Sequence, residues 1–158
     1  MDAQIDDWVS ADIRLATGSS NSPISTNQAL GGNNGNFSKY DVWVNRVYMQ
    51  FTPTEWATGF VGRMPNPFWT TDLLFDDDLN FDGTASQLTY RADDRTELFV
   101  NAGGFPVFNS NFNFPDFSTE KVKSRDKYLF AGQAGASYKI SKDYDVKGAL
   151  GYFDFETI

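Results

Sequence analysis

The feature that most constrains the fold is a regular alternation of two-sided strands with connections of two very different lengths. Seven segments show the period-two alternation of apolar and polar side chains that is typical of β-strands. They are residues 9–17, 40–51, 56–64, 83–91, 96–106, 127–140 and 145–155. Because short turns join antiparallel neighbours, the pattern predicts an all-β, up-and-down antiparallel meander of about seven long strands.

The connections differ in length from one end of the predicted sheet to the other. Those at 18–39, 65–82 and 107–126 are long and polar, whereas those at 52–55, 92–95 and 141–144 are tight turns. This asymmetry is typical of transmembrane β-barrels, while water-soluble sandwiches mix their loop lengths more freely. The strands, of about 9–14 residues, also suit a tilted crossing of a bilayer, since soluble strands usually hold about 5–6.

Aromatic residues gather near both ends of the predicted strands. Near the tight turns lie Trp8, Trp56, Tyr90 and Tyr138, and near the long loops lie Tyr40, Trp43 and Tyr128. Two such levels indicate aromatic girdles at the two surfaces of a membrane.

Strand parity predicts which side chains would line a wet interior and which would face lipid. The predicted inner set is Asp12, Arg14, Arg46, Arg63, Gln87, Arg91, Glu97, Asn101, Gln133 and Lys139, and the outer set is Val9, Ile13, Leu15, Leu98, Val100, Phe130 and Ile140. Turning Arg46 to hydrocarbon would cost about 2–4 kcal/mol near the midplane, which favours its inward placement. Alternation alone also fits a soluble sheet whose apolar face is a core.

Composition excludes several classes of function. The net charge of -8 argues against a nucleic-acid partner, and the absence of Cys and His excludes zinc sites and Cys–His or Ser–His catalytic pairs built on those residues. No apolar run reaches the roughly 20 residues of a membrane helix. Because Met1 is followed at once by acidic residues rather than by an export signal, we expect residues 1–158 to be a single β-barrel segment of a longer protein.

The central part of the sequence carries a recognisable signature. Residues 62–83 read GRMPNPFWTTDLLFDDDLNFDG, and further matches are LATG at 15–18, STNQ at 25–28 and GYFDF at 151–155. These stretches resemble the putative porin family of Gram-negative bacteria. The resemblance implies a transmembrane β-barrel in the outer membrane, surrounded by lipid, that passes small hydrophilic solutes or ions by passive diffusion. It implies neither an enzyme nor a cofactor, and the full-length barrel is a candidate homo-oligomer.

Acidic and basic side chains form a candidate constriction. If the loop with Asp76, Asp77 and Asp78 folds into the barrel, its carboxylates would face lumen arginines and set a field that sorts solutes by charge. The candidate pore-lining set is Asp12, Arg14, Arg46, Arg63, Asp76, Asp77, Asp78, Arg91 and Glu97. The alternatives are an outward, solvated loop, and arginines neutralised by wall carboxylates such as Asp12 or Glu97.

The acidic residues allow two other interpretations, a calcium site and a glycosidase site. Asp78, Asn80 and Asp82, followed by Gly83, imitate the start of a calcium loop, but Thr89 stands where an EF-hand needs a bidentate carboxylate. A weaker surface calcium site is an alternative to a hydrated acidic loop. No two glutamates pair on one predicted face, so a glycosidase is not expected.

Two further functions differ from a channel. One is a secreted β-sandwich that binds carbohydrate on Trp8, Trp43 and Trp69, and the other is an adhesin-like barrel whose loops bind partners without conducting.

Overall fold

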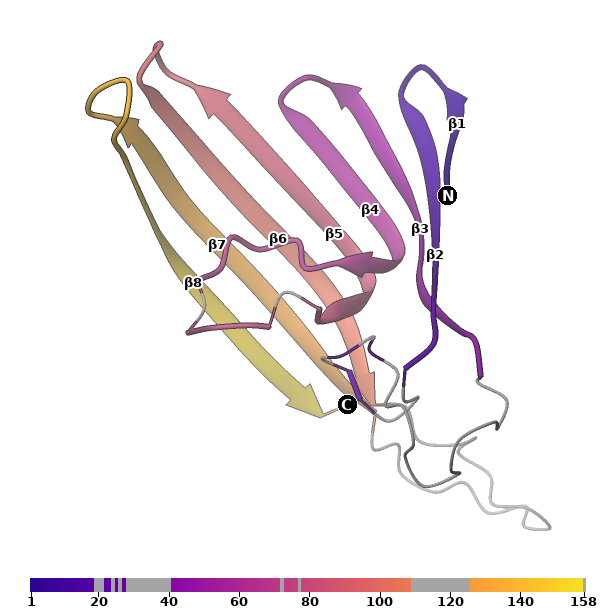
Figure 1. Cartoon of the computed structure of the whole chain (residues 1–158). Coiled ribbons are helices and arrows are strands. Elements are labelled where there is room, and N and C mark those ends of the chain that lie inside the picture. The colour runs from indigo at the N-terminus through magenta and orange to yellow at the C-terminus, as the bar shows by residue number, and fades with distance from the viewer. Residues whose placement is uncertain are drawn as a thin grey trace, which may run out of the picture.

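The described residues form a single curved sheet (Figure 1). The computed structural model describes residues 1–18, 22, 23, 25, 27, 41–71, 73–76, 78–108 and 126–157. In this part of the chain, eight strands follow one another in sequence order, each antiparallel to the next (Figure 1). They are β1 (Asp2–Asp6), β2 (Val9–Ala16), β3 (Trp43–Thr54), β4 (Ala57–Pro65), β5 (Asn80–Arg91), β6 (Thr96–Phe108), β7 (Lys127–Lys139) and β8 (Asp145–Thr157). The predicted all-β antiparallel meander is confirmed, with one strand more than the seven expected.

The additional strand is β1. Its five residues are all exposed, and Asp2, Gln4 and Asp6 alternate with Ala3 and Ile5, a period-two pattern too short to mark a strand in the sequence. Backbone pairing with β2 defines it instead, with Ala3 opposite Ala11, and the amino group of Met1 donates to the carbonyl of Ile13 at 2.8 Å. Tyr40, the expected start of the next strand, lies outside the described residues.

The two ends of the sheet differ as the loop lengths predicted. Residues 7–8, 55–56, 92–95 and 140–144 connect strands at one end, which we call the turn end. Residues 17–42, 66–79 and 109–126 connect them at the opposite end, the loop end (Figure 1).

The sheet does not close on itself. Strands β1 and β8 are its two edges, and the strand order contains no pairing between them within the described residues. An open edge in hydrocarbon leaves backbone groups without partners, which is why membrane-spanning sheets close into barrels. The arrangement is that of part of a barrel.

Among the described residues there is no helix of the length and apolar character needed to cross a membrane.

The two faces of the sheet have different surroundings. Residues 66–79 leave β4, cross in front of β5 to β8 and return to β5 (Figure 1). We call the face that they cover the inner face. Its buried cluster consists of Met64, Phe68, Phe81, Ala85, Phe105, Leu129 and Ala131.

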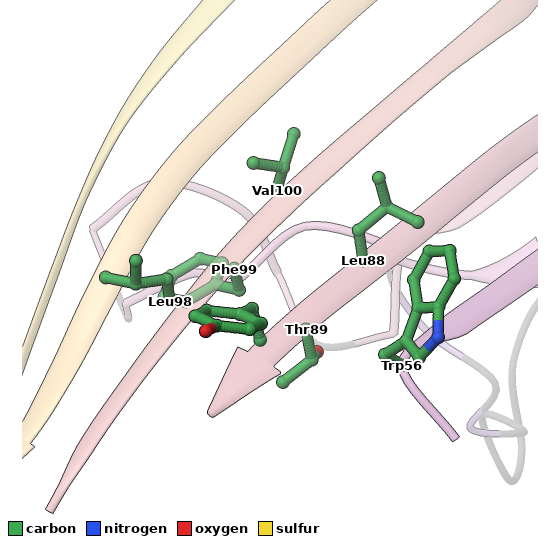
Figure 2. A pocket seen from close by; sticks show the side chains of 7 residues that line it. Trp56, Leu88, Thr89, Leu98, Phe99 and Val100 are labelled. Atoms are coloured by element: carbon green, nitrogen blue, oxygen red, sulfur yellow. The ribbon is translucent and has the colours of Figure 1, made fainter. Parts of the chain in front are cut away.

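The outer face carries large apolar side chains that are exposed in the described part of the chain. Among them are Ile13, Leu15, Val47, Met49, Val61, Leu88, Leu98, Val100, Phe130 and Leu150. Leu88, Leu98 and Val100 line an apolar hollow of about 350 Å³ beside Trp56, on the outer face of β5 and β6 (Figure 2). An uncovered apolar face of this extent is what a lipid-facing barrel wall presents.

Aromatic side chains stand at both ends of this apolar band. Tyr138 lies at the turn end of β7 and Tyr128 at its loop end, ten residues earlier on the same side of the strand. At about 3.3 Å per residue this separation is about 33 Å along the strand, or about 23–27 Å across a membrane for a tilt of about 35–45°. Exposed Trp56 and Tyr90 join Tyr138 toward the turn end. The spacing matches the apolar height of an outer-membrane barrel.

Arg63 corrects the predicted parity. In β4 the inward positions are taken by Phe60 and Met64, and Met64 is 0% exposed beneath the covering segment. Arg63 therefore points to the outer face, where it is the register partner of Val47 and Asp82. There its guanidinium pairs with the Asp82 carboxylate, and its Nε donates to the carbonyl of Asn45 at 2.9 Å. The expected inward placement is wrong because burial of Met64 fixes the alternation.

A single carboxylate organises the turn between β5 and β6. Asp93 accepts hydrogen bonds from the backbone of Arg95 at 2.7 Å and of Thr96 at 2.9 Å, and from the Thr96 hydroxyl at 3.0 Å. The Arg95 amide, followed by the Thr96 hydroxyl, lowers the pKa of Asp93 below its ordinary value of 3.8.

We predict that Asp93→Ala lowers the urea midpoint of the detergent-solubilised protein at neutral pH, followed by tryptophan fluorescence. Because the folded pKa is depressed, the stabilisation is present above pH 3.8 and is lost as the pH falls through the lower folded value. The wild type and the variant should therefore converge in acid. Asp94→Ala, in the same turn but without a side-chain hydrogen bond among the described residues, is the control. Equal effects of the two variants at neutral pH would contradict the prediction.

Candidate functional site

An aromatic cluster holds the covering segment, residues 66–79, against the inner face. The ring of Phe68 meets those of Phe81, Phe105 and Phe153 edge-on, with centroids 5.9, 6.0 and 5.3 Å apart. Phe75, in the part of the segment that returns to β5, meets Phe81 and Phe153 in the same way, with centroids 5.8 and 5.5 Å apart. Edge-to-face pairs of this kind add about 0.5–1.5 kcal/mol each to the burial of the rings. The segment thus reaches from β5 to β8.

A row of three amide side chains fixes the outgoing arm of the covering segment. This arm is the part that leaves β4 and contains Pro67 and Trp69. Gln87, Asn101 and Gln133 are cross-strand neighbours on β5, β6 and β7. Gln133 accepts from the backbone N–H of Trp69 at 2.8 Å and donates to the carbonyl of the same residue at 2.7 Å. Gln87 donates to the carbonyl of Pro67 at 2.6 Å. This amide row pairs the arm's backbone almost as a neighbouring strand would, although the arm is not a strand.

Two members of the amide row, Asn101 and Gln133, are buried and hydrogen-bonded to each other, and Gln87 is half-buried. Asn101 is 5% and Gln133 is 6% exposed. Asn101 donates to the Gln133 side-chain oxygen at 3.1 Å, which therefore accepts two hydrogen bonds. Since a buried amide without partners costs about 1–3 kcal/mol, the row favours the one position of the arm that satisfies it.

The acidic part of the covering segment is a compact turn. The Asp76 carboxylate accepts from the backbone N–H of Asp78 at 2.9 Å, and its carbonyl accepts from Leu79 at 3.1 Å. Asp76 is exposed and Asp78 half-buried, whereas Asp77 lies outside the described residues. The turn ends at Asn80, whose side chain donates to the carbonyl of Asp78 at 3.0 Å.

The inner wall formed by β1 to β3 lies outside the path of the covering segment (Figure 1). By register, Asp12 is opposite Asp2 on one side and Tyr48 on the other, and Arg14 is opposite Arg46. Tyr48 packs against the inner cluster, so alternation along β2 and β3 places Asp12, Arg14 and Arg46 on the inner face. This wall is polar, whereas the wall of β4 to β8 is aromatic.

A second polar region lies at the turn end of the inner face. Arg91 and Glu97 are cross-strand partners, and their side chains approach to 3.6 Å. The Lys147 ammonium lies 4.5 Å from the ring centroid of Phe99 and 5.8 Å from that of Trp69. This lysine and the amide row therefore meet the covering segment at the same residue, Trp69.

Most of the proposed pore-lining residues share one face, but they do not form one cluster. Asp12, Arg14 and Arg46 lie on β2 and β3, while Arg91 and Glu97 lie at the turn end of β5 and β6. Arg63 lies on the outer face with Asp82.

The weak calcium alternative does not fit the geometry. The side-chain oxygen of Asn80 accepts from Arg46 Nε at 2.6 Å, and the Asp82 carboxylate pairs with Arg63 on the outer face. The oxygens of Asp78, Asn80 and Asp82 therefore do not converge. Among the described residues no group of three His, Cys, Asp or Glu side chains is placed to hold a metal ion.

Sequence reasoning missed the aromatic inner wall. A signal for it was present, because the loop-end half of these strands is apolar at successive positions, as in Leu129, Phe130 and Ala131. Strands that are apolar on both faces are buried on both faces. With lipid on one side, the other side requires a cover from the chain itself.

We predict that Gln133→Leu frees the outgoing arm, since it leaves the N–H and the carbonyl of Trp69 without partners. Limited proteolysis of the folded protein should then cut within residues 66–79 faster than in the wild type. Gln50→Leu, on the inner face of β3 and hydrogen-bonded only to Thr52 among the described residues, is the control. Equal cleavage rates in the Gln133→Leu variant and the wild type would show that the aromatic cluster alone holds the arm.

The comparisons with known proteins agree with this geometry. A family model described as a putative porin matches residues 1–158, which is the whole chain. Comparison with curated proteins and with solved structures gives no match. The sheet has an apolar outer face, aromatic residues at both ends, and long and short connections on opposite sides. The chain belongs to the putative porin family.

Proposed function

We propose that the protein forms part of the wall of a passive diffusion channel for small hydrophilic solutes or ions in the outer membrane of a Gram-negative bacterium. The observation that carries the proposal is the covering segment, which is held across the inner face of a sheet whose outer face is apolar. A segment bound in this way narrows the interior without closing it, because the wall of β1 to β3 stays outside its path (Figure 1).

The eight strands are proposed to be one section of a larger barrel. Within the described residues, β1 and β8 each pair with only one neighbouring strand, and in lipid the free edge of such a strand is stabilised by a further strand. Residues 1–158 then act as a single segment of the wall. Association of complete barrels into a homo-oligomer belongs to the same proposal.

The proposed roles of the site residues follow their position. Asp12, Arg14 and Arg46 line the open wall, and Asp76, Asp77 and Asp78 supply negative charge from the covering segment. Arg91 and Glu97 line the interior nearer the turn end. Arg63 has no such role, since its charge is compensated by Asp82 on the outer face.

No observation favours the alternative functions. A carbohydrate-binding sandwich needs two packed sheets, whereas the described residues form one. Its proposed stacking residues are also separated: Trp8 packs against Phe51, 6.2 Å between ring centroids, while Trp69 lies on the inner face beside Gln133.

The test of the proposed function is conductance in planar lipid bilayers. The complete protein, purified in detergent, should produce stable, ohmic single-channel steps in potassium chloride. A correctly folded protein that inserts and produces no steps would overturn the proposal and favour a closed, structural barrel.

We predict that replacing Asp76, Asp77 and Asp78 together by Asn lowers the cation preference measured by the reversal potential in a salt gradient. The carboxylates attract cations over about 10 Å at 0.1 M salt, so the difference from the wild type should shrink as the salt concentration rises. Replacing Asp94, Asp143 and Asp145 together by Asn makes the same change of charge at the turn end, on three exposed residues, and is the control. An unchanged reversal potential in the triple variant would place the acidic turn outside the conduction path.

A further inference from the structure

Two arginines stand side by side on the open part of the inner wall. Arg14 of β2 and Arg46 of β3 are direct cross-strand partners, and both are half-buried. Like charges in directly opposed positions of an antiparallel pair destabilise a sheet. The pairing therefore calls for a compensating group.

Neither arginine forms an ion pair with a nearby carboxylate in the described part of the chain. Within the described residues, the ion pairs are Arg63 with Asp82 and Arg91 with Glu97, so Arg14 and Arg46 have no carboxylate partner there. Asp12, two residues before Arg14, is instead the cross-strand partner of another acid, Asp2. Acid thus stands beside acid and base beside base, at adjacent inward positions of the same wall.

A hydrogen bond fixes the orientation of the Arg46 guanidinium. Arg46 Nε donates to the side-chain oxygen of Asn80 at 2.6 Å, and Asn80 is itself held by the carbonyl of Asp78. This contact uses one donor of Arg46 and leaves its terminal nitrogens available. Arg14 makes no hydrogen bond within the described part of the chain. Planar guanidinium groups with terminal nitrogens available are suited to bind a carboxylate, which they contact through two parallel hydrogen bonds.

The spacing of the two charge pairs sets the size of a ligand. Inward positions two residues apart on a strand are separated by about 6.6–6.8 Å. Asp12 lies within electrostatic range of both Asp2 and Arg46. A solute that carries a carboxylate and an ammonium group a few ångströms apart can therefore meet the arginines with one end and the acids with the other.

We infer that Arg14 and Arg46, with Asp12 and Asp2 beside them, form a binding site for small zwitterionic amino carboxylates on the channel wall. The inference rests on the proposed channel function and names its solute class. A simple carboxylate is attracted by the arginines but repelled by the acids. A simple amine is attracted by the acids but repelled by the arginines. The zwitterion is the form that benefits from both.

The experiment measures uptake of three probes of similar size into proteoliposomes that contain the complete channel. The probes are radiolabelled β-alanine, propionate and propylamine. In the wild type, β-alanine uptake should saturate with concentration and exceed that of the other two. Arg14→Gln should raise the β-alanine concentration for half-saturation about tenfold, the factor expected for one lost charge-assisted hydrogen bond. Arg14 has no described partner to lose, so its removal leaves the fold intact.

Two further variants make the result specific. Asp12→Asn should reduce the advantage of β-alanine over propionate, since it removes the acid that faces the ammonium group. Arg95→Gln makes the same change of charge as Arg14→Gln in a turn at the other end of the sheet and should change nothing. If wild-type uptake of β-alanine does not saturate, or Arg14→Gln leaves it unchanged while the channel still conducts potassium chloride, the inference is overturned and the channel function stands. A wild-type protein that inserts but does not conduct potassium chloride would refute the channel function itself.

Discussion

The burial of Phe68 determines which part of the inner face is packed and which part stays polar. Its ring is 5% exposed and meets aromatic rings on β5, β6 and β8, so the segment that carries it must cross the sheet. The amide row then fixes the backbone of the next residue, Trp69. The inner wall on β5 to β8 is thereby packed, whereas the polar wall on β1 to β3 lies outside the path of the segment (Figure 1).

Close packing around this cluster explains one unusual backbone feature. Gly62 and Gly83 are cross-strand partners on the inner face, and both have a positive φ, of 120° and 143°. A Cβ at Gly62 would meet the backbone of Val47 and Tyr48, and one at Gly83 would meet that of Gly104 and Phe105. Neighbouring backbone therefore approaches these two positions closely, beside Tyr48, which packs against the cluster, and Phe105, which belongs to it. Glycine adopts this positive-φ conformation without the strain of other residues.

The sequence alone predicts much of this architecture because the strand period and the loop lengths are local signals. The antiparallel order, the two kinds of ends, and the inward positions of Arg14 and Gln133 all follow from them. Strand β1 does not, since its alternation of polar and apolar residues spans only five positions, and its pairing with β2 is what defines it. Arg63 does not either, because its direction is set by the burial of Met64 beneath a segment whose path the sequence does not reveal.

The candidate site was predicted in part for the same reason. Charged residues were assigned to the inner face by parity, which requires no tertiary information. Their grouping requires knowing which wall the covering segment occupies. The Phe68 contacts place that segment on β5 to β8, which separates Arg14 and Arg46 from Arg91 and Glu97. Parity also predicts that the amide row points inward, but its contact with Trp69 joins positions 64 residues apart and has no local signal.

If the polar part of the inner face is wet and the outer face lies in hydrocarbon, the accessibility of side chains should alternate along β2. The sequence contains no cysteine, so single cysteines introduced along β2 report on one site at a time. The complete protein in lipid vesicles would be treated with a charged, membrane-impermeant thiol reagent. The account predicts that cysteines at Ser10, Asp12 and Arg14 react and that cysteines at Ala11, Ile13 and Leu15 do not. Equal reaction on both faces, or the reverse pattern, would contradict it.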